Sequence, residues 1–297
     1  MKFSVVTPTY NRADYVAQTI ESVLSQKGDF EIEYIVMDGG SMDDTLSVIQ
    51  AYQEKIENGQ YPIQCRAVTM KVMSEKDHGS CDAYAKGFAL TTGDIFSGLG
   101  SDDILLPGAL ATMHEVFTTH SNIAWVRGRH ALMSPLGTIY AIPTIRGYYR
   151  PWLARGVYGR NAYWMAFEAT FWRRGLWEKS GNIRNDLHDA CDYALWISFA
   201  KHASLYSLDA AVVAFRMHAN QRSKDVNGYR EEMLSVRAST FPDKGISLFF
   251  RITNDFPHIL SSLVPYLYVI CFGNQHFQFI RYDKHGKSTL VTSALFE

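Results

Sequence analysis

The sequence has few cysteines, no excess of either charge and no long uninterrupted apolar run. Its 4 cysteines among 297 residues form no CxxC pair, and this sparse pattern is typical of reduced thiols in a cytoplasm. The formal net charge is -1, so there is no broad basic field and we expect no nucleic-acid partner. A composition of 47% hydrophobic and 20% charged residues excludes a disordered chain and is typical of a globular enzyme.

The sequence also lacks a clear leader and a clear membrane span. It enters a strand-like segment at Phe3, so we expect no secretory signal. The nearest candidate for a span, residues 259–272, is short and contains Pro265, which favours a buried helix or one lying on a membrane surface. We predict a cytoplasmic protein, with peripheral contact at the inner face of the cell membrane left open. The sequence leaves the oligomeric state open as well.

The first 120 residues alternate between short apolar runs and amphipathic segments. Four apolar runs predict strands, at residues 3–6, 32–37, 68–73 and 95–99. Helical spacing of apolar residues and helix-start signals predict helices at residues 14–24, 45–56 and 82–90 and after Pro107. This alternation predicts an α/β fold, with an open, mostly parallel sheet covered by helices on both faces.

The alternation weakens after about residue 123. Residues 189–200 predict a helix, residues 211–215 predict a strand, and the chain from Tyr229 on is typical of helices. We therefore expect one domain over residues 1–225, with a nucleotide-binding half at 1–120 and an acceptor half at 121–225. A helical C-terminal extension is expected over residues 226–297.

Carboxylates follow several of the predicted strands. Asp38 ends the second strand, Asp77 lies in the loop after the third, and Asp102 and Asp103 follow the fourth. Open α/β sheets bind ligands beyond the carboxyl ends of their strands. Converging carboxylates repel one another unless a cation joins them, and together with phosphate oxygens they suit Mg or Mn. The acidic pair therefore predicts a metal–diphosphate anchor, whereas the alternative is a solvated turn that caps the next helix.

The two loops nearest the first strand offer weaker signals. The segment Asp38–Ser41 is either an ordinary turn or a site where Asp38 accepts a hydrogen bond from a base or ribose. The loop Pro8–Asn11 offers backbone groups and the ring of Tyr10, which could equally be a core or lid residue.

Four segments, taken together, carry a family resemblance. They are Val5–Arg12, Ile35–Thr45, Ser74–Ala83, and a final stretch made of Thr92–Ile95, Ser101–Asp103 and Pro107–Leu110. In this order they resemble the family 2 glycosyltransferases of the GT-A fold, and shorter matches follow at Ala169–Arg174 and Cys191–Trp196. The resemblance implies a Rossmann-like sheet and an inverting transferase.

The resemblance also implies a donor site. The nucleotide of a nucleotide-diphosphate sugar would be bound by five residues, with the aspartate of the second strand near the uracil of a UDP-sugar: Pro8, Tyr10, Asp38, Asp77 and Asp102. A divalent cation, Mn or Mg, would be the cofactor and would neutralise the leaving diphosphate. Asp103 would be its direct ligand, and His218 would approach the metal or the diphosphate. A lone histidine is more often a structural residue, and that alternative stays open.

Asp192 falls where the family places its catalytic base, which accepts the proton of the acceptor hydroxyl. The alternative is a carboxylate on a helix surface, with Asp189 as the fallback base. Three residues with a weaker match on the acceptor side are Glu168, Arg173 and Trp196. The sequence departs from the family pattern in four places, which are Gly100, Glu168, Cys191 and Ala194.

Residues 146–164 are rich in aromatic and basic side chains. Such side chains could stack on sugar rings and pair with the phosphates of a lipid-linked acceptor. The alternative is a loop that packs its aromatic side chains on the core.

The leading hypothesis is therefore an inverting, metal-dependent glycosyltransferase of surface polysaccharide or glycan biosynthesis, acting on a glycan or lipid-linked acceptor. The QxxRW motif of processive synthases is absent, which favours single additions. One rival is a catalytically silent nucleotide-sugar binding or scaffold protein of a glycan-assembly complex. A nucleotidyltransferase is disfavoured, because the loop Pro8–Arg12 has no glycine to bind a triphosphate.

Overall fold

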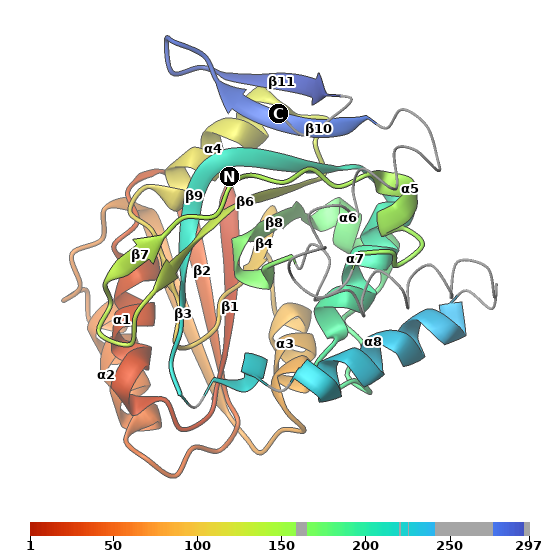
Figure 1. Cartoon of the computed structure of the whole chain (residues 1–297). Coiled ribbons are helices and arrows are strands. Elements are labelled where there is room, and N and C mark those ends of the chain that lie inside the picture. The colour runs from red at the N-terminus through yellow and green to blue at the C-terminus, as the bar shows by residue number, and fades with distance from the viewer. Residues whose placement is uncertain (159–164, 220, 225, 241–275, 294–297) are drawn as a thin grey trace.

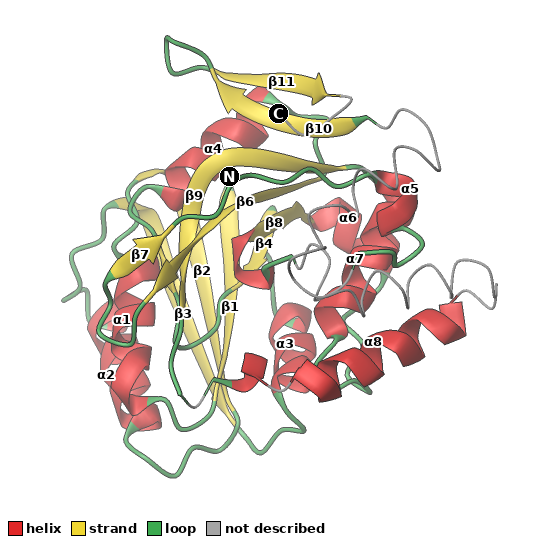
Figure 2. Cartoon of the chain, in the orientation of Figure 1, coloured by secondary structure: helices red, strands yellow, loops and turns green. Residues whose placement is uncertain are grey.

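The computed structural model describes residues 1–158, 165–219, 221–224, 226–240 and 276–293. Its N-terminal half is built on four parallel strands, shown in Figures 1 and 2: β1 (Lys2–Thr9), β2 (Gly28–Asp38), β3 (Cys65–Ser74) and β4 (Ile95–Gly98). They lie in the order β3-β2-β1-β4, and β1 pairs in parallel with both β2 and β4. The carboxyl ends of these strands therefore meet at one edge of the sheet.

Helices cover both faces of this sheet. In chain order they are α1 (Ala13–Leu24), α2 (Thr45–Glu57), α3 (Ser80–Ala89) and α4 (Ala109–Thr119). Val16 and Ile20 of α1 and Leu110 of α4 share one buried cluster, because apolar residues at helical spacing form one face. Tyr84 and Phe88 of α3 belong to the second cluster, on the other face. The strands and helices predicted for this half are confirmed to within a few residues at their ends.

The second half extends the same sheet and makes it mixed. Its main strands are β6 (Trp125–Met133), β8 (Thr170–Arg173) and β9 (Leu205–Arg216), joined by the short strands β5 (Ile104–Leu105) and β7 (Ile139–Ala141). Strand β8 runs antiparallel to both β4 and β6, whereas β6 and β9 are parallel. The helical segments here are α5 (Arg150–Leu153), η1 (Phe167–Ala169), α6 (Arg174–Ser180), α7 (Cys191–His202) and η2 (Arg222–Lys224).

The C-terminal region is only partly helical. Helix α8 (Val226–Thr240) agrees with the predicted helical extension, but β10 (Phe277–Tyr282) and β11 (Ser288–Ser293) are strands, and here that prediction was wrong. The reason is an alternation of apolar residues: Phe277 and Phe279 are buried on one side of a strand that pairs with β9. The predicted membrane-surface segment at 259–272 lies outside the described residues. Among the described residues, no helix is both long and apolar enough to cross a membrane.

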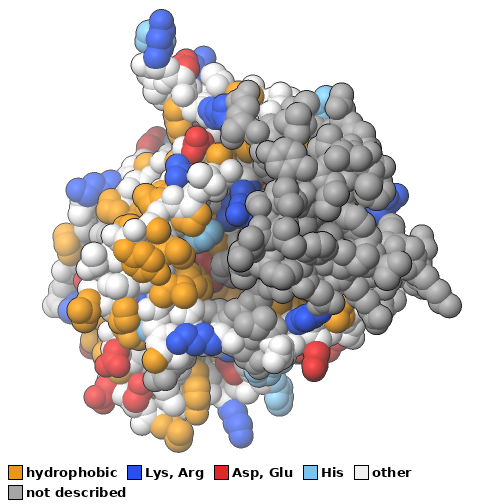
Figure 3. Space-filling model, viewed as in Figure 1, with side chains coloured by type: hydrophobic (Ala, Val, Ile, Leu, Met, Phe, Trp, Pro, Cys, Tyr) orange, Lys and Arg blue, Asp and Glu red, His pale blue; other side chains and the backbone are white. Residues whose placement is uncertain are grey.

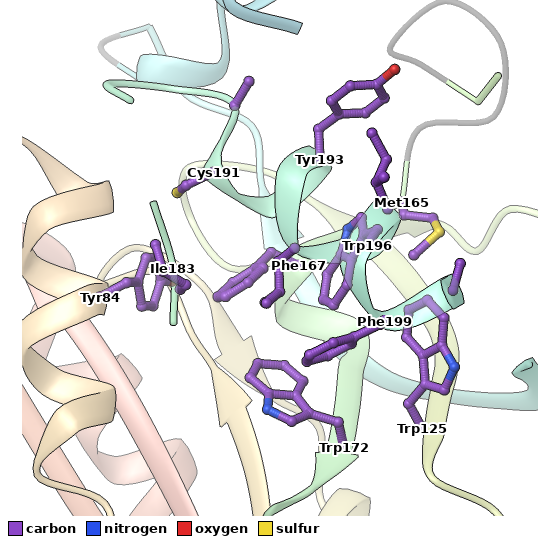
Figure 4. Packing of buried hydrophobic residues seen from close by; sticks show 14 of the residues in the cluster. Tyr84, Trp125, Met165, Phe167, Trp172, Ile183, Cys191, Tyr193, Trp196 and Phe199 are labelled. Carbon is purple, nitrogen blue, oxygen red and sulfur yellow. The ribbon is translucent and has the colours of Figure 1, made fainter. Parts of the chain in front are cut away.

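Aromatic side chains form the core between α7 and the sheet. Figure 4 shows Trp196 of α7 among Phe167, Trp172 and Phe199, and its side chain is only 3% exposed. Arg173 donates hydrogen bonds to the carbonyls of Ile123 and Phe117. Arg173 and Trp196 are therefore packing residues. The structure does not place them on the acceptor side of the site, where the sequence predicted them.

The aromatic and basic segment also packs inward over its described part. Tyr148, Trp152 and Tyr158 are buried in the same aromatic core, and Arg150 donates to the carbonyls of Ala200 and Lys201 at the end of α7. This agrees with the core-packing alternative. Four of the exposed large hydrophobic side chains lie in or beside β7, where Figure 3 shows a hydrophobic patch, and they are Leu136, Ile139, Tyr140 and Ile142.

One disulfide joins the two halves of the molecule. Cys81 at the start of α3 is bonded to Cys191 at the start of α7, with the Cα atoms 5.8 Å apart and 110 residues between them in the chain. The prediction of reduced thiols was therefore wrong for this pair. Spacing along the chain could not reveal it, because the sheet brings the two helix starts together.

Candidate active site

A cavity of about 1460 Å³ lies beyond the carboxyl ends of the parallel strands. It is lined from both halves of the chain, and its lining includes Pro8, Tyr10, Asp77, Asp102, Asp103, Glu168, Asp192 and Arg222. The loops that follow β1, β2 and β4 meet at this cavity, because these parallel strands end at the same edge of the sheet. The volume is ample for a nucleotide sugar, since ligand pockets typically measure about 300–1,000 Å³.

The acidic pair sits in the turn after β4. Asp103 is 2% exposed, and its Oδ1 accepts a hydrogen bond from the backbone N–H of Arg216 at 2.8 Å. Burial, the nearby Asp102 carboxylate and Glu168 together raise the pKa of Asp103 well above its usual range. The raised pKa shows that buried carboxylates oppose one another's ionisation here, and a bound cation would relieve that opposition.

Gly100 opens a space between these two carboxylates. A Cβ added at Gly100 would lie 2.8 Å from Oδ2 of Asp103 and 3.1 Å from Oδ1 of Asp102. The two oxygens thus border a common space that a side chain at this position would fill. Mg²⁺ and similar cations bind through one or two carboxylates plus substrate phosphates, so the pair fits an open metal site. No group of three or more His, Cys, Asp or Glu residues suited to a metal occurs in the described part of the chain.

His218 follows β9 and faces this acidic pair. Its Nε2 lies 2.8 Å from Oδ2 of Asp102, and its side chain is buried. Arg12 approaches the same oxygen, with Nε at 3.5 Å. The structure therefore brings His218 to Asp102, the neighbour of the predicted metal ligand Asp103.

The residues predicted to bind the nucleotide lie at different depths. Pro8, Tyr10 and Asp77 line the cavity, and Tyr10 is 48% exposed. Asp38 is buried, and its carboxylate accepts hydrogen bonds from Ser41 and Ser74. It therefore holds the turn after β2 together, as the turn interpretation predicts. Only its neighbours in that turn reach the cavity wall.

Asp192 lies in the first turn of α7, at the cavity wall. Its Oδ1 accepts hydrogen bonds from the backbone N–H of Tyr193 at 2.7 Å and from the hydroxyl of Tyr229 at 3.0 Å. Burial raises the pKa of Asp192 to about 6, against the opposing effect of these two hydrogen bonds and of Arg222. A carboxylate with this pKa is ionised at neutral pH yet basic enough to accept a proton.

Glu168 lines the cavity near Asp192. Its Oε2 is buried without a hydrogen-bond partner. Burial raises the pKa of Glu168 to about 7, and the charges of Asp192 and Asp102 add to this rise. The residue therefore exchanges its proton near neutral pH and can donate a hydrogen bond to a ligand when protonated.

Among the cavity residues that the sequence analysis missed are Arg222 and Tyr229. Arg222 lines the cavity, contacts the Ser80 hydroxyl and pairs with Asp189, with Nε 2.9 Å from Oδ1. Its only signal was the segment Gln221–Ser223, the nearest approach in the sequence to the absent QxxRW motif. Tyr229 lines the cavity from α8, a helix that the sequence places in the extension. Nothing in the spacing of the sequence indicates that this helix returns to the site.

The chain shares a family with known proteins. Residues 4–171 match the sequence profile of Glycosyl transferase family 2. An uncharacterised glycosyltransferase of Nostoc sp. is 34% identical over 119 residues, which cover 40% of this chain and 34% of that protein. Another, from Rickettsia prowazekii, is 24% identical over 80% of this chain and 76% of that protein. A PGL/p-HBAD biosynthesis glycosyltransferase of Mycobacterium bovis is 29% identical over 61% of this chain and 64% of its own length.

Solved structures share the fold. S. aureus TarS 1-349 in complex with UDP-GlcNAc superposes with a TM-score of 0.60 at 15% identity, covering 92% of this chain and 73% of that one. The mannosyltransferase PcManGT from Pyrobaculum calidifontis, in complex with GDP-Man and Mn2+, gives 0.59 at 15% identity, covering 90% and 75%. The predicted α/β fold of GT-A type is thereby confirmed.

Proposed function

The chain belongs to Glycosyl transferase family 2, and from that premise we propose that it transfers a sugar from a nucleotide-diphosphate donor to a glycan or lipid-linked acceptor, inverting the anomeric carbon. UDP is the expected nucleotide, and surface polysaccharide or glycan assembly is the expected setting. The observation that carries the proposal is that the adjacent pair Asp102 and Asp103 lines one cavity with Asp192, which is far from the pair in sequence, and with Pro8 and Tyr10.

The acidic pair and two arginines would hold the donor. Asp103 and Asp102 would bind a divalent cation in the space opened by Gly100, and the bound cation would neutralise the leaving diphosphate. Arg12 and Arg222 both line the cavity, and guanidinium groups pair well with phosphate oxygens. The ring of Tyr10, half exposed at the rim, would stack on the base.

Asp192 would serve as the base. The acceptor hydroxyl attacks the anomeric carbon while Asp192 takes its proton, and the bond between that carbon and the diphosphate oxygen breaks. A single in-line displacement inverts the configuration and requires no nucleophile from the protein. This role suits a carboxylate that lines the cavity and has a pKa of about 6.

A lipid-linked acceptor is favoured by the exposed hydrophobic side chains over β7. Leu136 is 94% exposed and Tyr140 58% exposed, and the same hairpin accepts a hydrogen bond at the Pro135 carbonyl from Arg216, which lines the cavity. A hydrophobic surface joined to the rim would place the protein at a membrane surface, where it would meet a lipid carrier.

The test is a release assay for free nucleotide with Mn²⁺, a panel of UDP- and GDP-sugars and a lipid-diphosphate acceptor. Asp192→Asn is expected to bind donor and lose turnover by at least about a hundredfold. Asp103→Asn is expected to lose metal-dependent donor binding. Asp29→Asn, which removes an exposed partner of Arg66, is the matched control and should behave as the unmodified protein.

Two outcomes would contradict the proposal. Donor binding without turnover by the unmodified protein, under every condition, would favour the silent binding or scaffold protein. Full turnover by Asp192→Asn would remove Asp192 from the role of base.

A further inference from the structure

Helix α8 approaches the start of α7 with two side chains that lie nearly one turn apart. The Tyr229 hydroxyl donates to Oδ1 of Asp192 at 3.0 Å. The Glu232 carboxylate accepts from the backbone N–H groups of His188 and Asp189, each at 2.7 Å, and from that of Ala190 at 2.9 Å. Both contacts join α8 to the start of α7, between residues 37 to 44 positions apart in the chain.

The Glu232 contact holds the turn that leads into α7, at a helix start without a side-chain cap of its own. The residue before the helix is Ala190, which has no side-chain oxygen, and no side chain there caps the helix. Glu232 satisfies the N–H of the N-cap residue Ala190 and those of the two residues before it, and a carboxylate there suits the positive end of the helix dipole. These three hydrogen bonds outweigh burial and lower the pKa of Glu232, so the group stays charged in the range where the protein would work.

The Tyr229 contact decides which oxygen of Asp192 is left for the acceptor. Within the described part of the chain, both hydrogen bonds to this carboxylate, from Tyr193 and from Tyr229, fall on Oδ1. The other oxygen, Oδ2, is therefore the one available to take a proton. A fixed rotamer matters here, because a base must meet its proton at hydrogen-bond distance.

We propose that Tyr229 and Glu232 are positioning residues for Asp192, so that α8 belongs to the active site rather than to a separate extension. This inference rests on the proposed function, in which Asp192 is the base. Tyr229 orients the carboxylate directly, and Glu232 holds the backbone turn that carries it. The Cys81–Cys191 disulfide fixes the adjoining residue, so the first turn of α7 is held from two sides.

The charged and titratable groups around Asp192 set its pKa, which the pH dependence of kcat reports. They are Tyr229 from α8, Arg222 from η2 and Glu168 from η1. Arg222 and the Tyr229 hydrogen bond favour the ionised carboxylate. Tyr229→Phe removes the hydrogen bond from the tyrosine hydroxyl and leaves the ring in place, so the pKa of Asp192 should rise.

The experiment measures kcat and donor KM across pH for Tyr229→Phe. We expect kcat to fall about tenfold with donor KM unchanged, and the acid limb of the profile to move up by roughly half to one pH unit. Tyr61→Phe is the matched control, because it removes a hydrogen bond to Glu21 on α1, away from the cavity. That variant should leave both kcat and the acid limb unchanged.

Glu232→Gln tests the second contact independently. Its single amide oxygen replaces a carboxylate that accepts three N–H groups, so kcat should fall severalfold with donor KM held. The inference would be overturned if Tyr229→Phe left kcat and the acid limb unchanged and Glu232→Gln kept full kcat. An inactive Asp192→Asn would, in that case, still uphold Asp192 as the base. An active Asp192→Asn would instead overturn the proposed function on which the inference rests.

Discussion

The Nε2 of His218 lies 2.8 Å from Oδ2 of Asp102, although 116 residues separate them in the chain. The pair joins the turn after β4 to the segment after β9, and so connects the two halves of the molecule at the cavity. Because Arg12 approaches the same carboxylate oxygen, Asp102 is held in place beside Asp103. The geometry of the proposed metal site thus depends on a residue from the far half of the fold.

Replacing His218 with Ala should weaken metal binding. Loss of a group that orients a ligand or its neighbour typically costs about 10–100-fold in metal affinity, so we expect the Mn²⁺ concentration for half-maximal activity to rise at least about tenfold. A metal titration of activity measures this. His285→Ala, in the exposed turn between β10 and β11, is the control, and an unchanged titration for His218→Ala would contradict the expected role.

Replacing Glu168 with Gln should stabilise the protein at alkaline pH. The pKa of Glu168 is raised by burial to about 7 in the folded protein, from 4.5, so folding favours the protonated form. Its contribution is present below pH 4.5 and is lost as the pH rises through 7. At pH 8 we expect the variant to be more stable by about 1–3 kcal/mol.

Urea unfolding at pH 4.5 and at pH 8 measures this difference for Glu168→Gln. The exposed Glu178→Gln on α6 is the control and should show no gain that depends on pH. If Glu168→Gln is less stable than the unmodified protein at pH 8, then the ionised carboxylate has a stabilising partner and the expected sign of the effect is wrong.

Replacing Glu33 with Gln should destabilise the folded protein at neutral pH. Burial raises its pKa, but hydrogen bonds from Ser4 and from the hydroxyl and N–H of Thr92 outweigh burial and lower the pKa to about 2. Its contribution is present above pH 4.5 and is lost as the pH falls through 2. We expect a cost of about 2–4 kcal/mol at pH 7.

The Glu33 variant should also leave donor KM unchanged. Glu33 pairs with Ser4 near the start of β1, whereas the cavity lies beyond the ends of these strands. Thermal or urea unfolding and donor kinetics measure the two effects separately, with the exposed Glu31→Gln on the same strand as control. A changed donor KM with normal stability would show that this end of the sheet communicates with the site.

Reducing the Cys81–Cys191 disulfide should destabilise the protein. A cross-link over 110 residues removes much of the freedom of the unfolded chain, and native disulfides are typically worth about 2–4 kcal/mol. We expect Cys81→Ser to unfold at lower urea and the reduced unmodified protein to approach it. Cys65→Ser, at a free cysteine, is the control. Equal stability with and without reductant, and no cross-linked peptide by mass spectrometry, would contradict the disulfide.

The sequence alone determined the alternating framework and the order of the donor-side motifs. Residues such as Val5, Val6 and Ile35 mark buried strands because apolar residues in short runs have few other stable places, and carboxylates that follow parallel strands must share an edge. Asp102, Asp103 and Asp77 were therefore predictable as cavity residues. Each of these aspartates follows shortly after its strand in the sequence, so its place at the sheet edge can be predicted from the local pattern.

Only the tertiary structure decided which distant residues complete the site. Tyr229 reaches Asp192 from a helix that the sequence places in an extension, Cys81 meets Cys191, and Trp196 turns into the core instead of toward an acceptor. Local sequence patterns do not predict these contacts, because each contact depends on how helices pack on a mixed sheet. The same is true of the short strands β10 and β11: β10 is stabilised by pairing with β9 and β11 by pairing with β10, and the local sequence does not reveal these partners.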